Sequence, residues 1–467
     1  MYEAPIRPGE TWFAARLRRH LGELIRLAVP TVISRFGVLM IAQVDAVMVG
    51  HAATAELAYL NIGNAVVINI IVACMGLLLG TLVMTSNAFG AENYRACGAA
   101  WRRSLPMACG LGLIDLTIAW QGRDLMEILG QTGDLAAGSG AVAHIMGIGV
   151  LPVLIFLTTN FFLEGLRRPL PGMVLMLLAN VLNVGLNWVF IYGMGPVPAM
   201  GAEGAAWATT VVRWALAVSI VAYVWWLPDR DRFGLRAPDL DPAAGRTQRR
   251  IGYATGLGMA AESAAFTAMI LFAGWLGELP AAAYGIAFNL LALFFMVAIG
   301  IGGATSVRVG IAFGRRDRAD MELAGWTGLG ANTVLAGGIG LLIFFQADLL
   351  VGFYTADPAL IPIARSLVVV VAGVLVLDGG QAVMAQALRG RRDVWAPMVC
   401  QIGCYGGVMV PVAYWVAIPL GYEVQGLIWT VMGASAISII LLAGRFRLLA
   451  RRPLGQPPSG AIDTSRR

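Results

Sequence analysis

The sequence predicts an all-α polytopic membrane protein, with twelve transmembrane helices arranged as two six-helix bundles that are related by a parallel internal duplication. Of its 467 residues, 58% are hydrophobic and 13% are charged, and the mean hydropathy is +0.74. About a quarter of the residues of a soluble globular protein are charged, so the composition excludes that class. Apolar stretches of about 20 residues, the length that crosses a bilayer as a helix, recur along the whole chain.

Twelve apolar spans alternate with polar connections. We expect the spans at 24–50, 60–86, 104–122, 139–163, 172–193, 204–227, 251–274, 281–305, 326–346, 362–387, 396–418 and 424–446. Because their number is even, both termini lie on one side of the membrane. Arg residues cluster in every second connection, for example at 167–168 and 389–392, and are almost absent from the connections between. The positive-inside rule therefore predicts that both termini are cytoplasmic.

The longest polar break falls at the middle of the chain. Residues 228–250 are rich in Pro and Arg, which is typical of a linker between two halves. We therefore expect five parts: a cytoplasmic N-terminal segment at 1–23, an N-terminal six-helix lobe at 24–227, the interlobe linker at 228–250, a C-terminal six-helix lobe at 251–446 and a cytoplasmic tail at 447–467.

The two halves also match each other in sequence. A shift of 224 residues places Gly50 on Gly274, Ala58 on Ala282 and the pair Phe89-Gly90 on Phe313-Gly314. Such self-similarity indicates an internal duplication of six helices. Because each half begins on the same side, the repeat is parallel, as in transporters that rock two bundles about a central path.

Six charged residues lie in the interior of the predicted spans, away from their ends: Arg35, Asp45, Asp115, Arg213, Glu262 and Asp378. A carboxylate at the centre of a membrane helix costs at least roughly 2.5 kcal/mol, a cost that indicates a function. Glu262 and Asp378 lie roughly 17 and 14 Å from the cytoplasmic ends of their helices, at about 1.5 Å per residue, so they could meet. Asp45 lies in the other lobe, closer to the outer side.

Several polar residues are candidate ligands of an ion or a substrate beside these acids. On the fifth span, Asn180, Asn183 and Asn187 fall on one helix face, and Asn187 lies close to the level of Asp45. Further candidates are Gln381, one turn beyond Asp378, Asn289 in the eighth span and Arg213.

Structural roles remain open for each of these residues. A buried acid can form a salt bridge with a buried Arg: Arg35 could neutralise Asp115, and Arg213 could approach Asp45 or be purely structural. The Asn residues of the fifth span could equally join helices by hydrogen bonds.

Four stretches resemble the multidrug and toxic compound extrusion (MATE) family: VDAVMVGHAATAELAYLNIGNAV, TSNAFGAENYRA, NVLNVGLNWVFIYG and ALRGRRDVWAPM. The resemblance runs from about residue 24 to residue 446, and Glu262 in the context IGYATGLGMAAES is similar to the NorM-like branch. It implies a multidrug antiporter in which Asp45, Glu262 and Asp378 match the acids used for cation coupling. Asn187 stands where other branches carry a second acid.

We therefore expect a secondary antiporter that exports amphipathic, mainly cationic xenobiotics in exchange for Na⁺ or H⁺. A carboxylate withdrawn from water favours a bound proton or cation, and a cationic substrate can compete for the same charge. We expect no cofactor, no metal other than Na⁺ at Glu262 and Asp378, and a monomer in the bacterial inner membrane. Nucleic acid is not an expected partner, because the net charge of +6 is distributed between the spans.

Two other functions fit the sequence less well. A flippase for lipid-linked saccharides would share the duplicated architecture, but it would need several Arg residues for a pyrophosphate, and four of the six buried charges are acidic. An integral membrane enzyme would need a cluster of catalytic side chains at a membrane surface, and the sequence shows no such spacing. The chain is therefore not expected to be an enzyme.

Overall fold

The computed structural model describes residues 11–52, 54–128, 130–194, 196–237 and 241–451, and this part of the chain is helical almost throughout. The first half forms α1 (Trp12–Ala52), the 3-10 turn η1 (Thr54–Glu56), α2 (Leu57–Leu78), α3 (Gly80–Gly90), α4 (Tyr94–Ala119), α5 (Gly122–Ile128), α6 (Gly133–Ile148), α7 (Val150–Gly165), α8 (Leu170–Tyr192) and α9 (Gly201–Trp225). The second half forms α10 (Pro242–Trp275), α11 (Glu278–Gly314), α12 (Arg318–Phe345), α13 (Ala347–Gly352), α14 (Leu360–Gly390), α15 (Trp395–Gln401), the π-helix η2 (Ile402–Met409), α16 (Val410–Ala417) and α17 (Glu423–Ala450).

The predicted all-α membrane architecture is confirmed. In the described part of the chain, ten helical segments are long and apolar enough to cross a membrane, and α6 with α7, bent by 41° where they meet, gives an eleventh if the two form one span. Helix α4 stands at the third predicted span. It is not among these segments and carries Arg95, Arg102, Arg103 and Asp115.

Several helices extend beyond the predicted spans. Helix α1 begins at Trp12, well before residue 24, and α10 begins at Pro242, inside the predicted linker. The start of α10 has a clear local cause. The Asp241 side chain accepts hydrogen bonds from the backbone N–H groups of Ala243 and Ala244, both at 3.0 Å, and proline suits the first helical position.

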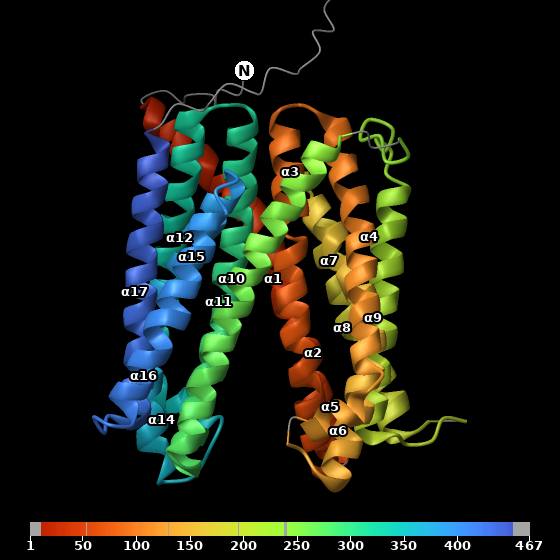
Figure 1. Ribbon diagram of the computed structural model, residues 1–467, viewed down its shortest axis with the longest axis vertical. Helices are drawn as coiled ribbons and strands as arrows, with labels where there is room; N and C mark the ends of the chain where they lie inside the picture. Colours follow the sequence, from red (N-terminus) through yellow and green to blue (C-terminus); the bar gives the residue numbers. More distant parts are fainter. Residues whose placement is uncertain (1–10, 53, 129, 195, 238–240, 452–467) are drawn as a thin grey trace, which may run out of the picture.

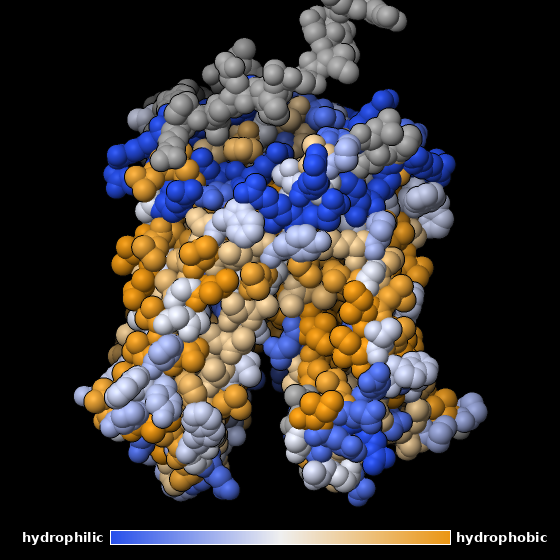
Figure 2. Space-filling view, viewed as in Figure 1, coloured by the Kyte–Doolittle hydropathy of each residue, from blue (hydrophilic) through white to orange (hydrophobic). Residues whose placement is uncertain are grey.

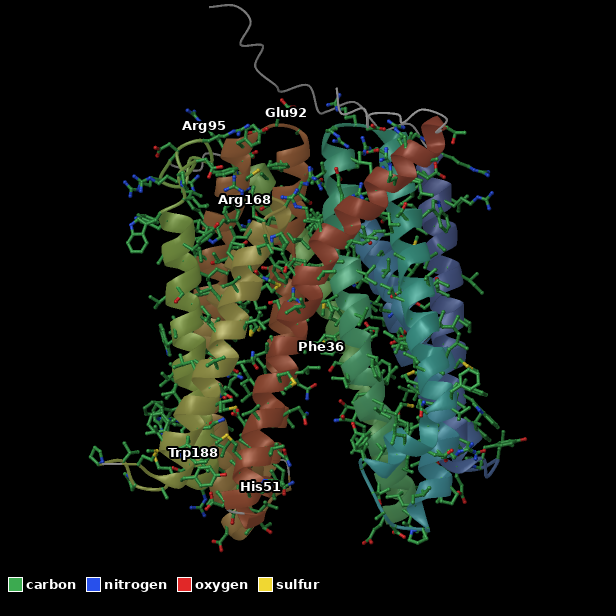
Figure 3. The ribbon with its side chains drawn as sticks, turned by 180° about the vertical axis from the view of Figure 1, so that it is seen from behind. Phe36, His51, Glu92, Arg95, Arg168 and Trp188 are labelled. Carbon is green, nitrogen blue, oxygen red and sulfur yellow. The ribbon has the colours of Figure 1, made fainter. Side chains whose placement is uncertain are left out.

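Helices α2 to α9 form one bundle and α10 to α17 form the other (Figure 1). Helix α1 joins the two, because it packs on α8 of the first bundle and on α11 of the second. Figure 3 shows α1 starting over the second bundle and running past Phe36 down to His51 in the first. We call the end that holds the start of α1, Arg95 and Arg168 the Arg-rich end, and the end that holds His51 and Trp188 the open end.

A cleft separates the bundles at the open end and closes toward the hydrophilic Arg-rich end (Figure 2). One apolar cluster crosses from bundle to bundle, with Leu78 and Leu82 of the first and Ile301 and Val307 of the second. Separate apolar cores lie within each bundle. The two packed bundles are therefore joined across part of their facing surfaces, and the cleft lies between the rest.

Candidate ion-coupling and substrate sites

Asp45 is buried in the first bundle, with 2% of its surface exposed, and three neighbours donate hydrogen bonds to its carboxylate. One oxygen, Oδ1, accepts from Asn183 Nδ2 at 3.1 Å and from Asn187 Nδ2 at 2.7 Å. The other oxygen accepts from the hydroxyl of Thr209 at 2.5 Å. The two Asn residues reach one oxygen because they stand one turn apart on α8. The structure therefore brings three of the predicted residues together and adds Thr209 of α9.

Two predicted ligands lie apart from the acids. Asn180 donates to the backbone oxygens of Gly37 at 3.1 Å and Met176 at 2.9 Å, so it ties α8 to α1 without reaching Asp45. Asn289 accepts a hydrogen bond from the hydroxyl of Tyr354 at 2.8 Å, at an exposed position. The structure gives both side chains structural partners.

The sequence left open that Arg35 neutralises Asp115, and the structure gives Arg35 a different partner. Arg35 pairs instead with Glu164 at the end of α7, with 3.6 Å between Nη2 and Oε1. Because α4 begins at Tyr94, ten residues before the predicted span, Asp115 lies roughly 15 Å further from the start of its helix than the predicted span implies. Asp115 is buried there, and its Oδ2 has no hydrogen-bond partner among the described residues.

Arg213 forms no ion pair with Asp45 or Asp115 in the part of the chain that the structure describes. Its Nη1 donates to the backbone oxygen of Met146 at 3.3 Å. Both acids still lie within electrostatic range of its charge. Arg213 therefore acts on the Asp45 cluster through space and not through contact.

Glu262 lies in the second bundle, held by two glutamine side chains. Its Oε1 accepts from Gln381 Nε2 at 2.9 Å and its Oε2 from Gln401 Nε2 at 2.7 Å. Gln401 in turn accepts from Arg389 Nη2 at 2.8 Å. Three helices, α10, α14 and α15, thus converge on this carboxylate.

Asp378 stands one turn before Gln381 on α14 and has hydroxyl partners. Its Oδ1 accepts from Tyr405 Oη at 2.7 Å and from Ser435 Oγ at 3.0 Å. Tyr405 belongs to the π-helix η2, an irregular element that often marks functional sites. Gln381 thus lies between the two acids of this bundle, bonded to Glu262 and one turn from Asp378.

A cavity lies between the bundles, where Glu262 faces groups of the first bundle. Its wall includes Arg35 and Glu164 from one bundle and Glu262 and Arg389 from the other. Met75, Met259, Phe161 and Phe295 supply apolar surface. The arrangement is typical of a small-molecule site: apolar walls with a few charged groups.

Each half of the chain matches a known protein family. The sequence model of the MatE family matches residues 30–189 and 254–415, with one match in each half of the chain. The chain belongs to the MatE family.

Relatives of this MatE protein are named as multidrug resistance proteins. A probable multidrug resistance protein NorM of Caulobacter vibrioides is 37% identical over 429 residues, which cover 91% of each chain. The multidrug resistance protein PmpM of Pseudomonas aeruginosa is 29% identical over 460 residues, 94% of each chain. The predicted NorM-like branch is confirmed, and the family comprises transporters and not enzymes.

A solved structure shows the same fold. It is described as an outward-facing conformation of a multidrug resistance MATE family transporter of the MOP superfamily. The TM-score is 0.84 at 20% sequence identity, with 92% of this chain and 96% of that chain covered.

At the Arg-rich end, polar contacts close the space between the bundles of this MatE protein. The Oδ1 of Asn87 in α3 accepts from Arg392 Nε at 2.7 Å. Glu23 of α1 lies between Arg167 at 3.3 Å and Arg308 of α11 at 3.2 Å. These contacts must break if the bundles are to separate at this end.

The described residues contain no group of three or more His, Cys, Asp or Glu side chains that could hold a metal ion. A cation at either acid would therefore need amide, hydroxyl or backbone oxygens as further ligands. In this MatE protein, Asn187 and Thr209 stand beside Asp45, and Tyr405 and Ser435 stand beside Asp378.

Proposed function

We propose that this MatE protein is a secondary antiporter that exports amphipathic, mainly cationic compounds across the bacterial inner membrane in exchange for Na⁺ or H⁺. One observation carries the proposal. Each bundle holds an acid cluster, with the buried Asp45 in one and the partly buried Glu262 near the buried Asp378 in the other, and a cleft that is open at one end only lies between the bundles.

The acid clusters fit a reversible exchange of cations. Each carboxylate is withdrawn from water, so a proton or a small cation relieves the cost of its charge. Small hard cations take oxygen ligands. The Oδ1 of Asn187 is buried beside Asp45 without a hydrogen-bond partner among the described residues, and it could serve as one. A proton would bind to the carboxylate itself. Either ion would weaken the attraction between the carboxylate and the N–H groups around it.

The two-bundle architecture fits alternating access by a monomer. The present conformation opens the cleft at the open end, and the contacts of Asn87 and Glu23 close the other end. We place the Arg-rich end in the cytoplasm by the positive-inside rule, so this conformation would face outward.

The test is substrate uptake into inverted membrane vesicles that contain the full chain. Uptake of the same dye is measured under an imposed Na⁺ gradient and under an imposed pH gradient. Uptake driven by one gradient and abolished by its collapse is the expected result. Uptake that requires ATP, or that neither gradient drives, would refute the proposal.

Two residues support the flippase alternative, because Arg35 and Arg389 both line the cavity. Glu164 and Glu262 line it as well, which leaves no excess of positive charge for a pyrophosphate. The balance of charge therefore favours the antiporter.

A further inference from the structure

The cavity between the bundles is unusual for a site that takes cations, because its formal charges are balanced. Two guanidinium groups, of Arg35 and Arg389, and two carboxylates, of Glu164 and Glu262, line the same space. A site built for cations alone needs only the acids, and buried Arg residues are costly in a membrane protein. The two guanidinium groups therefore require an explanation.

Neither guanidinium uses its full hydrogen-bonding capacity. Arg35 makes no hydrogen bond within the described residues: it has the 3.6 Å ion pair with Glu164 and a contact of 5.4 Å with the ring centre of Phe161. Its side chain is only 11% exposed, and its Nε is buried without a partner. A guanidinium has five N–H donors, and leaving them unpaired in a buried site is costly.

Arg389 is in a similar state on the opposite wall. The residue is 3% exposed and donates one hydrogen bond, to Gln401 at 2.8 Å, while its Nε has no partner among the described residues. Both residues line the cavity, and each has a donor without a hydrogen-bond partner among the described residues. Both groups have the planar fork that matches a carboxylate.

We propose that Arg35 and Arg389 form an anion subsite that receives the carboxylate of a zwitterionic substrate, whose ammonium group binds at Glu262 or Glu164. This inference rests on the proposed export function and names a class of substrate for the same cavity. A zwitterion adds one charge of each sign and leaves the cavity neutral. The Phe and Met side chains of the wall would contact the apolar body of the substrate.

A multiply charged anion fits less well. A pyrophosphate would bring at least two negative charges into a space that already holds two carboxylates, with only two guanidinium groups to offset them. Uncompensated buried charge is strongly unfavourable. The charge balance therefore selects a single carboxylate accompanied by a cationic group.

The test compares two dyes that differ in one group: a rhodamine with a free carboxylate, and the methyl ester of the same dye. Binding to the purified full-length protein is measured by fluorescence polarisation. Arg35→Gln should weaken binding of the carboxylate dye by 10-fold or more, since a charge-assisted hydrogen bond is worth roughly that factor. Binding of the ester should stay within about twofold or become tighter.

Two further variants sharpen the result. Arg35→Lys keeps the charge without the fork and should restore part of the affinity for the carboxylate dye. Arg123→Gln, which removes an exposed Arg that pairs with Glu127 outside the cavity, should change neither dye. If Arg35→Gln does not fold, as judged by its thermal unfolding, Arg389→Gln is measured with the same two dyes and the same criterion.

An equal loss for both dyes, no loss for either, or a wild-type protein that fails to bind the carboxylate dye would overturn the inference. A different result would refute the proposed export function itself. It would appear as absence of ester-dye transport by the wild-type protein in vesicles, whatever the Arg35 variants do.

Discussion

Gly90 in α3 and Gly314 in α11 make the same contact in opposite directions. A Cβ atom on Gly90 would lie 2.1 Å from the backbone oxygen of Ile311, and one on Gly314 would lie 2.1 Å from the backbone oxygen of Asn87. The sequence shift of 224 residues relates Gly90 to Gly314 and also Asn87 to Ile311. Such reciprocity is what a two-fold axis between two copies of one unit requires. The two repeats therefore meet about this axis, between α3 and α11.

Gly90→Ala should disrupt the joint between the bundles. The added methyl group would meet backbone at a distance that no side-chain rotation relieves, and overpacking of this kind costs about 1–3 kcal/mol. We expect a lower unfolding temperature and slower dye export, and a similar effect of Gly314→Ala. The control is Gly110→Ala in α4, where a Cβ would meet nothing within 4 Å. Unchanged stability and export in both joint variants would show that the bundles are not held together here.

The Arg168–Asp229 pair at the Arg-rich end should make stability depend on pH. Arg168 donates to both carboxylate oxygens of Asp229, at 3.0 and 2.6 Å. This hydrogen bonding and the charge of Arg168 hold the pKa of Asp229 below its usual value. A carboxyl whose pKa is lower in the folded state stabilises the protein above its unfolded pKa of about 4, and the contribution disappears as the pH falls through the folded value.

Asp229→Asn should therefore lower the unfolding temperature slightly at neutral pH, because a partly exposed pair is worth less than about 1 kcal/mol. The difference from the wild type should shrink as the pH falls below about 4. Asp231→Asn is the matched control, since the Asp231 side chain is 94% exposed. A pH-independent difference between Asp229→Asn and the wild type would contradict the assignment.

Helical periodicity predicts part of the Asp45 cluster. Asn183 and Asn187 stand one turn apart, and this spacing in the sequence is enough to place them on one helix face. Thr209 was missed because it reaches Asp45 from α9, and the sequence does not reveal which helices pack together. Tyr405 and Ser435 were missed for the same reason, since each belongs to a different helix from Asp378.

Two charged residues just outside the predicted spans, Glu164 and Arg389, are buried in the structure. Glu164 and Arg389 lie just beyond the predicted span ends at residues 163 and 387, so they are not among the six charged residues assigned to the interior of the spans. Helix α7 instead continues to Gly165 and α14 to Gly390, and both charged residues are buried. Hydropathy places the apolar part of a helix, but it does not show where neighbouring helices cover its ends.

The Arg-rich end should be cytoplasmic, and the test is labelling of cysteines introduced at exposed positions. Asp231 near the end of α9 and Arg447 near the end of α17 are suitable sites. We expect labelling by a membrane-impermeant maleimide only after the cells are opened, by the positive-inside rule. Labelling of either site from outside intact cells would invert the topology.

Asp45→Asn should fold almost normally but lose export. The substitution removes a charge whose burial is costly. The single amide oxygen can still accept from Asn183 and Asn187, and the amide NH2 group can donate to the hydroxyl of Thr209, which can also act as an acceptor. Asn187→Ala should impair export less, because it removes one of three donors and leaves the charge. Dye efflux from cells with matched expression measures both variants. Normal efflux by Asp45→Asn would assign Asp45 a structural role.

Glu262 and Asp378 should behave as one cation site, because Gln381 lies between them and each carboxylate lies within electrostatic range of the other. If the coupled ion is Na⁺, Glu262→Gln or Asp378→Asn alone should weaken Na⁺-driven uptake strongly, and the double variant should be little worse than either single variant.

If the coupled ion is H⁺, Na⁺ should have no effect, and the pH optimum of uptake should move to lower pH in each single variant. Removing one negative charge makes it easier for the remaining carboxylate to ionise, so a more acidic solution is needed to keep it protonated. The measurement is uptake into inverted vesicles as a function of pH and Na⁺ for the wild type, both single variants and the double variant. Losses that multiply in the double variant, with unchanged Na⁺ and pH dependence in the single variants, would show that the two acids act at separate sites.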